Sequence, residues 1–314
     1  MEKLHKKKTV AEIDPDEFID DIFFVKYKKS FFGSSFQIAL SDSSGKLLDF
    51  SISKDRKDLR EFYDSIKTGC VVRVKGRAMR SENRIQLIGD EIEVLKEGEY
   101  HEGSFMKPPR KDVDLMYKKI LDSIDEIDDE TLRGMVQSIF NEEGERFKVW
   151  PAAMEIHHNW RGGLMEHTME VLECCRTSKN IYEILDTDLL IAGALLHDVG
   201  KLSELTSGIR TKFTDEGQFL GHIVLGLLYV SRKCDEFEID EKKKNKLLHM
   251  VASHHGRSTY GSPREPMFPE AFVLYYADEF SSKVSRIVDF VGNSKTSSGD
   301  FAYSRRDERG IYLR

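Results

Sequence analysis

The first hundred residues contain several short apolar runs, and turn-forming residues separate the runs. The runs are rich in β-branched and aromatic residues, and segments such as SDSSGK and KTG lie between them. One stretch between the third and fourth runs, Asp58–Ile66, has a helical pattern instead. The pattern therefore predicts five strands, at Phe18–Tyr27, Ser35–Leu40, Lys46–Ile52, Cys70–Ala78 and Arg84–Leu95.

Five short strands with one helix between the third and fourth are typical of an OB-fold β-barrel, and another small β-barrel is the alternative. The stretch Gly98–Asp112 concentrates glycine, proline and charge without apolar periodicity, which is typical of a linker. After it, apolar residues recur at helical spacing, first over Leu115–Ile127 and then over Leu132–Phe140. We expect a multidomain α and β protein with a nucleic-acid-binding barrel at residues 1–100, a linker at 101–112 and an all-α domain at 113–314.

Histidines and aspartates lie on the apolar faces of five predicted helical segments. His167 follows Leu164 by three positions within an apolar stripe, and His197-Asp198 ends the run LLIAGALL, which is apolar on all sides. For any single one of these side chains, a hydrogen-bonded core residue is the simpler interpretation. The complete set is His167, His197, Asp198, His222, His254, His255 and Asp278.

This set of inward imidazoles and carboxylates favours a metal site, because burying each of them without a partner is energetically unfavourable. A bound cation offsets that cost, and imidazole and carboxylate are common metal ligands. One ion needs about three or four ligands, so the set is large enough for two ions with Asp198 placed to bridge them. Two such ions are suited to phosphate-ester hydrolysis. Lys201 could donate to a phosphate oxygen beside Asp198, and an ordinary helix-terminal cation is the alternative.

Longer motifs narrow this interpretation. The order His…His-Asp…Asp, carried by His167, His197-Asp198 and Asp278, resembles the HD superfamily of metal-dependent phosphohydrolases. The string HHxxxxYGSP differs from the HHE…GYP loop of cyclic-di-GMP phosphodiesterases of the HD class. The longer strings resemble YhaM-type 3′→5′ exoribonucleases, which join an OB fold to an HD domain, and the resemblance covers about residues 145–285 within a domain core at 145–290. It is carried by HHNWRGGLMEHTMEV, LLHDVGK, EGQFLGHIVLG, SHHGRSTYGSP and EAFVLYYADEFSSK.

The resemblance implies that the seven side chains are metal ligands and that Asp198 and Lys201 lie at the catalytic centre. It implies two divalent ions, Mn²⁺ first, with Fe, Co²⁺ or Mg²⁺ as alternatives. Which of His254 and His255 binds an ion directly stays open. His157 and His158 belong to a matching string as well, but a substrate-side or structural role fits them equally.

The net charge of −7 at first speaks against a nucleic-acid partner. The barrel region, however, contains 19 basic and 19 acidic side chains, so the excess of acid lies entirely in the remainder. Arg73, Lys75 and Arg77 alternate along one predicted strand and so share a face, while Tyr27 and Phe31 lie among lysines. Such a group is suited to single-stranded RNA, and a solvated strand face with aromatics in the core is the alternative.

We expect a metal-dependent 3′→5′ exoribonuclease that hydrolyses single-stranded RNA, with single-stranded DNA as a second substrate class, to nucleoside monophosphates. Arg161 and Arg257 lie near motif segments and are candidates for phosphate contacts. One alternative is a phosphohydrolase of nucleotides or cyclic dinucleotides with a regulatory barrel. Another is a nucleic-acid-binding module whose metal site is structural.

Location and partners follow from weaker signals. The four cysteines lack CxxC spacing, which favours free thiols in a reducing compartment. No apolar run reaches the length of a membrane span and no signal region leads the sequence. We therefore expect a cytoplasmic protein without a membrane partner, and a homo-oligomer is compatible with the sequence.

Overall fold

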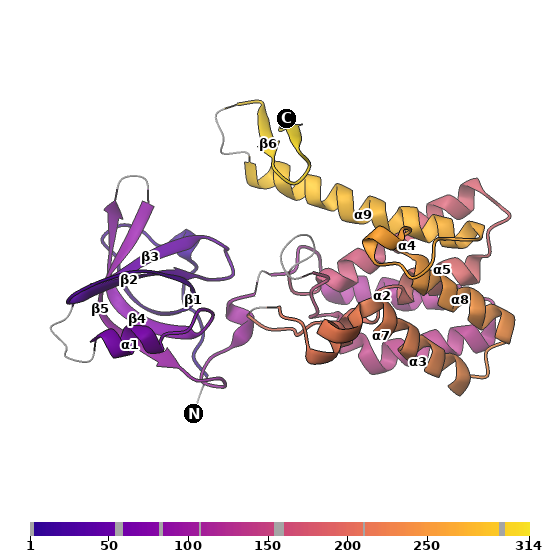
Figure 1. Ribbon diagram of the computed structural model, residues 1–314, viewed down its shortest axis with the longest axis horizontal. Helices are drawn as coiled ribbons and strands as arrows, with labels where there is room; N and C mark the ends of the chain where they lie inside the picture. Colours follow the sequence, from indigo (N-terminus) through magenta and orange to yellow (C-terminus); the bar gives the residue numbers. More distant parts are fainter. Residues whose placement is uncertain are drawn as a thin grey trace. The chain divides into compact units, whose positions relative to one another are not determined.

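The computed structural model describes residues 3–53, 59–81, 84–106, 108–153, 160–209, 211–294 and 299–314. The chain divides into two compact units, one of Met1–Pro108 with Gly208–Arg210 and the other of Pro109–Ser207 with Thr211–Arg314. The first unit is built of strands and the second mainly of helices (Figure 1). The predicted fold class, a β-barrel followed by a helical region, is confirmed.

The strands of the first unit close into a barrel in the order β1-β2-β3-β5-β4, and β4 pairs back to β1. Between neighbouring barrel strands, β3 and β5 pair in parallel and the other described pairs are antiparallel. This closed arrangement is OB-like. Its elements are η1 (Val10–Glu12), β1 (Phe18–Phe32), β2 (Ser35–Ser41), β3 (Leu47–Ser53), α1 (Leu59–Ser65), β4 (Val71–Ser81), β5 (Arg84–Leu95) and η2 (Glu102–Ser104).

The barrel core forms because alternate side chains of each strand point inward. Phe23, Phe36 and Phe50 are fully buried there. Gly89 of β5 packs against the ring of Phe50, and a Cβ at this glycine would come within 2.2 Å of a ring atom. Intervening residues point outward, so the outer surface of β4 and β5 carries the charged side chains.

The helices of the second unit surround one apolar core. The apolar run predicted to be central is α5 (Thr187–Leu196), whose residues from Leu189 to Leu196 are all buried, so this prediction is confirmed. Among the described residues, no helix is long and apolar enough to cross a bilayer. The other helices are α2 (Val113–Ile124), α3 (Glu130–Phe147), α4 (Gly163–Ile181), α6 (Lys201–Glu204), α7 (Asp215–Glu236), α8 (Glu241–Ser253), η3 (Ser258–Tyr260) and α9 (Pro269–Ser294).

The chain after α9 differs from the helical structure that the sequence predicted. Two short antiparallel strands, β6 (Phe301–Ser304) and β7 (Arg309–Tyr312), form a hairpin there. Asp307 in the turn accepts a hydrogen bond from Ser304 and pairs with Arg286 of α9. The expectation of an entirely helical region was therefore wrong for this segment, in which strands only four residues long give no clear alternating pattern.

Candidate metal centre

The predicted ligands come from five helical segments and converge beside the C-terminal end of α5. α4 supplies one ligand, the end of α5 two, α7 one, the end of α8 two and α9 one. In that order they are His167, His197, Asp198, His222, His254, His255 and Asp278. His222 and His255 are half-buried, and the other five side chains are buried.

The first group of ligand atoms surrounds Oδ2 of Asp198. The Nε2 atoms of His167 and His197 lie 3.2 Å apart, and each lies 3.4 Å from Asp198 Oδ2. Asp278 Oδ1 lies 3.1 Å from His167 Nε2. Two imidazole nitrogens and two carboxylate oxygens therefore point at one small region.

The second group faces the other oxygen of the same carboxylate. The Nε2 atoms of His222 and His254 each lie 3.6 Å from Asp198 Oδ1. The ring of His255 packs against both, with centroids 5.0 and 4.3 Å away. The side chain of Asp198 thus lies between two groups of ligands, with one oxygen toward each, as a bridging carboxylate would.

Unpaired buried atoms test whether a cation fits here. Asp198 Oδ1, His222 Nε2 and His254 Nε2 are buried and have no hydrogen-bond partner within the described parts of the chain. Leaving three such atoms unpaired is unfavourable, because each loses its hydrogen bonds to water. All three are electron-pair donors suited to a divalent cation. These residues therefore fit the divalent metal ions that the sequence predicted.

Backbone carbonyl groups fix the tautomers of two of the imidazole rings. His197 Nδ1–H donates to the carbonyl oxygen of Ala194 at 2.8 Å, and His254 Nδ1–H donates to that of Val251 at 2.7 Å. A carbonyl oxygen only accepts, so the proton lies on Nδ1 and the lone pair of a neutral ring lies on Nε2, facing Asp198. The backbone of α5 and α8 therefore orients two ligands for metal binding.

Glu204 holds His222 and was missed by the sequence analysis. Its Oε1 accepts hydrogen bonds from the backbone N–H of His222 at 2.9 Å and from Nδ1 at 3.1 Å. Gly221 has φ of 69°, which interrupts α7 and leaves the next N–H free to reach Glu204. Burial raises the pKa of Glu204, but the hydrogen bonds from His222 outweigh burial and lower it. Its position six residues after Asp198 gave no signal of this contact.

A serine and a glutamate hold His167 in the same way. Ser281 donates its hydroxyl proton to Glu170 at 2.7 Å and accepts from His167 Nδ1–H at 3.0 Å. Glu170 follows His167 by three positions on α4, and Ser281 follows Asp278 by three on α9. Helical spacing placed both residues on the ligand faces, so the pattern contained a signal that the sequence analysis did not use.

Replacing Ser281 with alanine is expected to weaken Mn²⁺ affinity by about 10–100-fold, since partners that orient metal-binding histidines typically contribute this much. Alanine is favourable within a helix, so α9 itself should stay folded. Isothermal titration calorimetry measures the affinity, with Ser285→Ala one turn away as the matched control. Equal affinities in the two variants would contradict an orienting role for Ser281.

The charges of the metal-free centre compensate one another. Burial lowers the pKa of His167, but hydrogen bonds and charge from Asp198 and Asp278 outweigh burial and raise it to about 9. Burial opposes ionisation of both carboxyl groups, yet Lys201 and the histidines lower the pKa of Asp198, and the histidines lower that of Asp278. Lys201 lies 2.6 Å from Asp198 Oδ2, and this contact outweighs burial and raises its pKa. The centre thus holds two carboxylates with an ammonium and an imidazolium.

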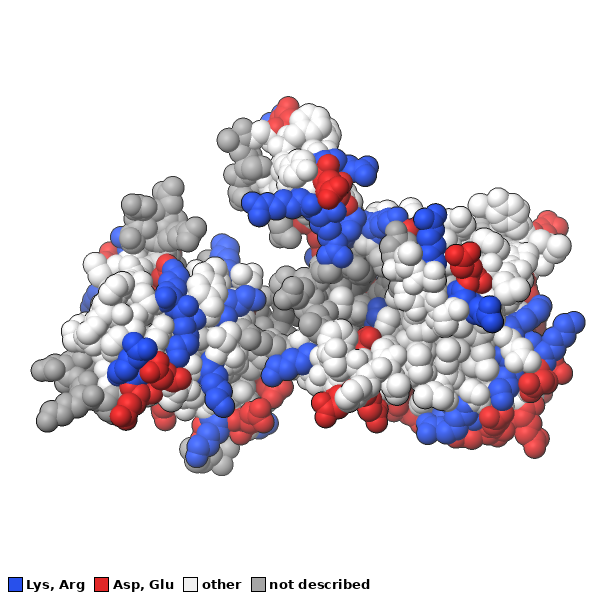
Figure 2. Space-filling model, viewed as in Figure 1, with Lys and Arg blue, Asp and Glu red and all other residues white. Residues whose placement is uncertain are grey.

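The predicted RNA-binding residues of the barrel are largely paired within it. Arg73 donates two hydrogen bonds to Asp20, at 2.7 and 2.8 Å, and Lys75 lies 2.7 Å from Glu91. Arg77 donates to a backbone carbonyl at 3.1 Å. They share one face of β4 as predicted from their spacing, but acidic side chains of the neighbouring strands β1 and β5 pair with two of them. Figure 2 likewise shows basic and acidic side chains interspersed on the visible face of the barrel.

The two predicted aromatic contacts differ from each other. Tyr27 is 42% exposed. Phe31 packs against Tyr63 of α1, with centroids 5.5 Å apart, and contributes to the barrel core. For Phe31 the structure therefore favours the core alternative.

The remaining candidates belong to the helical unit. Arg161 and Arg257 are both exposed, the first just before α4 and the second two residues after His255. His157 and His158 lie outside the described residues.

Comparisons with known proteins identify the helical region. A family model described as HD domain matches residues 164–283, which include all seven candidate ligands. Among solved structures, OBody AM1L10 bound to hen egg-white lysozyme is 19% identical over 29% of this chain and 95% of that chain, with a TM-score of 0.26. Asparaginyl-tRNA synthetase from Pyrococcus horikoshii is 11% identical over 94% of this chain and 67% of that chain, with a TM-score of 0.24. Scores this low support no conclusion about function.

The helical region therefore contains an HD domain, which indicates a superfamily of metal-dependent phosphohydrolases. The two groups of histidine and aspartate ligands agree with divalent-metal binding by such a domain. The HD domain and the OB-like barrel that the sequence predicted are therefore both supported.

Proposed function

We propose that this protein is a metal-dependent 3′→5′ exoribonuclease that shortens single-stranded RNA, and single-stranded DNA as a second class, to nucleoside monophosphates. The observation that carries the hydrolytic part is Asp198, which faces one ligand group with each oxygen. Similarity of the motifs to YhaM-type enzymes and the attached OB-like barrel support RNA as the substrate class. The two-ion centre, with Mn²⁺ as the first candidate, is part of this proposal.

Divalent ions held by these ligands would activate a water molecule and offset the negative charge of the phosphate. The protein's own part is to hold the ligands in place. Asp198 orients both groups, and the partners on the far side of four imidazoles keep their Nε2 atoms directed inward, those of His167, His197, His222 and His254. Lys201 uses one N–H on Asp198 and has two more for a phosphate oxygen at the same rim.

One observation favours a second candidate, a phosphohydrolase of nucleotides or cyclic dinucleotides. The barrel residues expected to hold RNA phosphates already pair with Asp20 and Glu91. Paired cations attract a phosphate chain less strongly than free ones do. In this alternative the barrel regulates the enzyme and does not hold the substrate.

A digest of 5′-labelled single-stranded RNA at increasing Mn²⁺ distinguishes the two. We expect a ladder that shortens stepwise from the 3′ end, with nucleoside monophosphates as products. The same RNA with a blocked 3′ terminus is the matched control and should resist digestion. Hydrolysis of free nucleotides or cyclic dinucleotides with intact RNA would favour the alternative, and internal fragments would exclude an exonuclease.

A further inference from the structure

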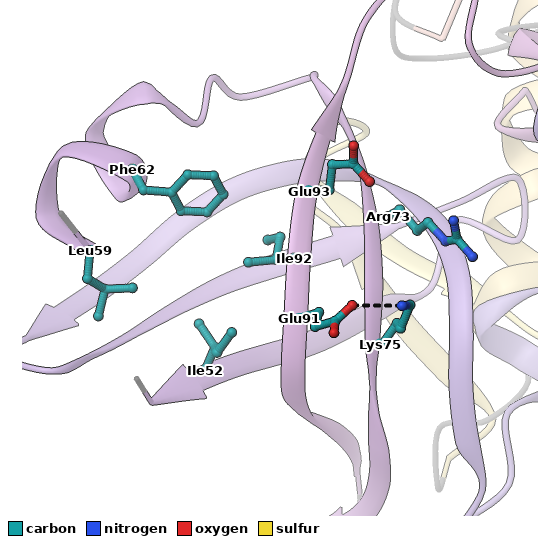
Figure 3. Close-up of a pocket in the computed structure, with 8 residues that line it drawn as sticks. All are labelled: Ile52, Leu59, Phe62, Arg73, Lys75, Glu91, Ile92 and Glu93. Carbon is teal, nitrogen blue, oxygen red and sulfur yellow. Dashed lines mark ion pairs between the residues drawn. The ribbon is translucent and has the colours of Figure 1, made fainter. Parts of the chain in front are cut away.

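A pocket of about 220 Å³ lies on the barrel where α1 meets β4 and β5 (Figure 3). Phe62 of α1 is half-buried, and its ring points toward β5. One side of the pocket is apolar, formed by Ile52, Leu59, Phe62 and Ile92. The other side is charged, formed by Arg73, Lys75, Glu91 and Glu93.

The size and the charge of this pocket restrict its ligand. A cavity of about 150 Å³ accepts benzene, so this pocket is large enough for a bicyclic ring. Two basic and two acidic side chains line it, and the guanidinium of Arg73 is bound to Asp20. A phosphate would meet no excess of positive charge here. A flat, neutral ring with a polar edge fits both sides.

Glu93 narrows the choice of ring. Lys75 is paired with Glu91, whereas Glu93 lies opposite Arg73 in the register of β4 and β5, and the guanidinium of Arg73 is bound to Asp20 instead. Glu93 is exposed on β5 and offers two acceptor oxygens. Guanine carries N1–H and N2–H donors side by side, which match a carboxylate bidentately. Adenine and uracil each lack this pair of donors.

We propose that this pocket binds a guanine base of an RNA strand, with Glu93 on the Watson–Crick edge and Phe62 against the face of the ring. The proposal rests on RNA being the substrate and assigns the barrel a role in reading bases. The paired cations Arg73 and Lys75 then position Glu91 and the rim of the pocket. Phosphate contacts on the barrel are not required.

Fluorescence anisotropy with the full chain in chelator tests this without hydrolysis. Two labelled dodecamers, repeating AAG and all-A, carry equal charge and differ only in guanine. We expect the wild-type protein to bind the AAG repeat about tenfold more tightly than all-A RNA. All-A RNA lacks guanine and so cannot form the charge-assisted hydrogen bonds to Glu93. Glu93→Gln should remove this preference and leave all-A binding unchanged. The control is Glu97→Gln, an exposed glutamate that does not line the pocket.

Further outcomes separate this proposal from the exoribonuclease proposal. Equal affinity of the wild-type protein for both RNAs, or a preference that persists in Glu93→Gln, would overturn the guanine site even if RNA is degraded. Binding of GMP over AMP that depends on Glu93, without RNA degradation, would support the site and overturn the exoribonuclease. Phe62→Leu should weaken GMP binding, and Phe32→Ala, an exposed aromatic outside the pocket, should not.

Discussion

Asp198→Asn is expected to lower the rate of phosphodiester hydrolysis by about 10³-fold or more, which corresponds to about 4 kcal/mol in the barrier. Asp198 is the only described carboxylate that faces both ligand groups, with Oδ2 3.4 Å from His167 and Oδ1 3.6 Å from His254. An amide carries no charge and offers one acceptor oxygen, so it cannot serve both groups. Initial rates of RNA shortening at saturating Mn²⁺ measure the effect.

The substitution also leaves Lys201 buried beside a neutral group, and breaking a buried ion pair destabilises a fold. The double variant Asp198→Asn/Lys201→Met restores the balance of charge and should regain thermal stability without regaining activity. Asp300→Asn, an exposed carboxylate paired with Arg314, serves as the control. Near-normal hydrolysis by a folded Asp198→Asn protein would refute a bridging role.

The barrel was predictable from the sequence because its strands have one face in a core. Phe23, Val25, Phe36, Ile38 and Leu40 are buried and lie in short apolar runs bounded by turn residues, so the runs and the turns located the strands. The hairpin after α9 was not predictable in this way. Phe301, Tyr303 and Tyr312 are more than half exposed there, and burial imposes no alternating pattern on strands of four residues.

The ligands were located for a similar reason. Each lies on the apolar face of its own helix, so the local pattern identified the polar residue that points inward. Their partners depend on contacts between segments. Ser281 reaches Glu170 on another helix, and Glu204 reaches His222 through the break at Gly221. The pairing of Arg73 with Asp20 joins β4 to β1 in a register that spacing along one strand does not determine.

Adding Mn²⁺ to the metal-free protein is expected to raise the melting temperature of the helical unit by on the order of 10 °C. At about 100 times its dissociation constant, an ion stabilises the folded state by about 2.7 kcal/mol, so two ions contribute about 5 kcal/mol. Each kcal/mol shifts the melting temperature of a domain of this size by about 2–4 °C. Calorimetry in chelator and in Mn²⁺ measures the shift.

This stabilisation should increase with pH between about 6.5 and 9. The raised pKa of His167, about 9, stabilises the metal-free fold below pH 6.5, and that contribution is lost as the pH rises through 9. An ion must displace the same proton, so its binding becomes more favourable over the same interval. His167→Gln removes this proton and should flatten the pH dependence, whereas His249→Gln, a histidine outside the ligand groups, should preserve it. The absence of any shift with Mn²⁺, Fe²⁺, Co²⁺ or Mg²⁺ would mean that the seven side chains do not form a metal centre.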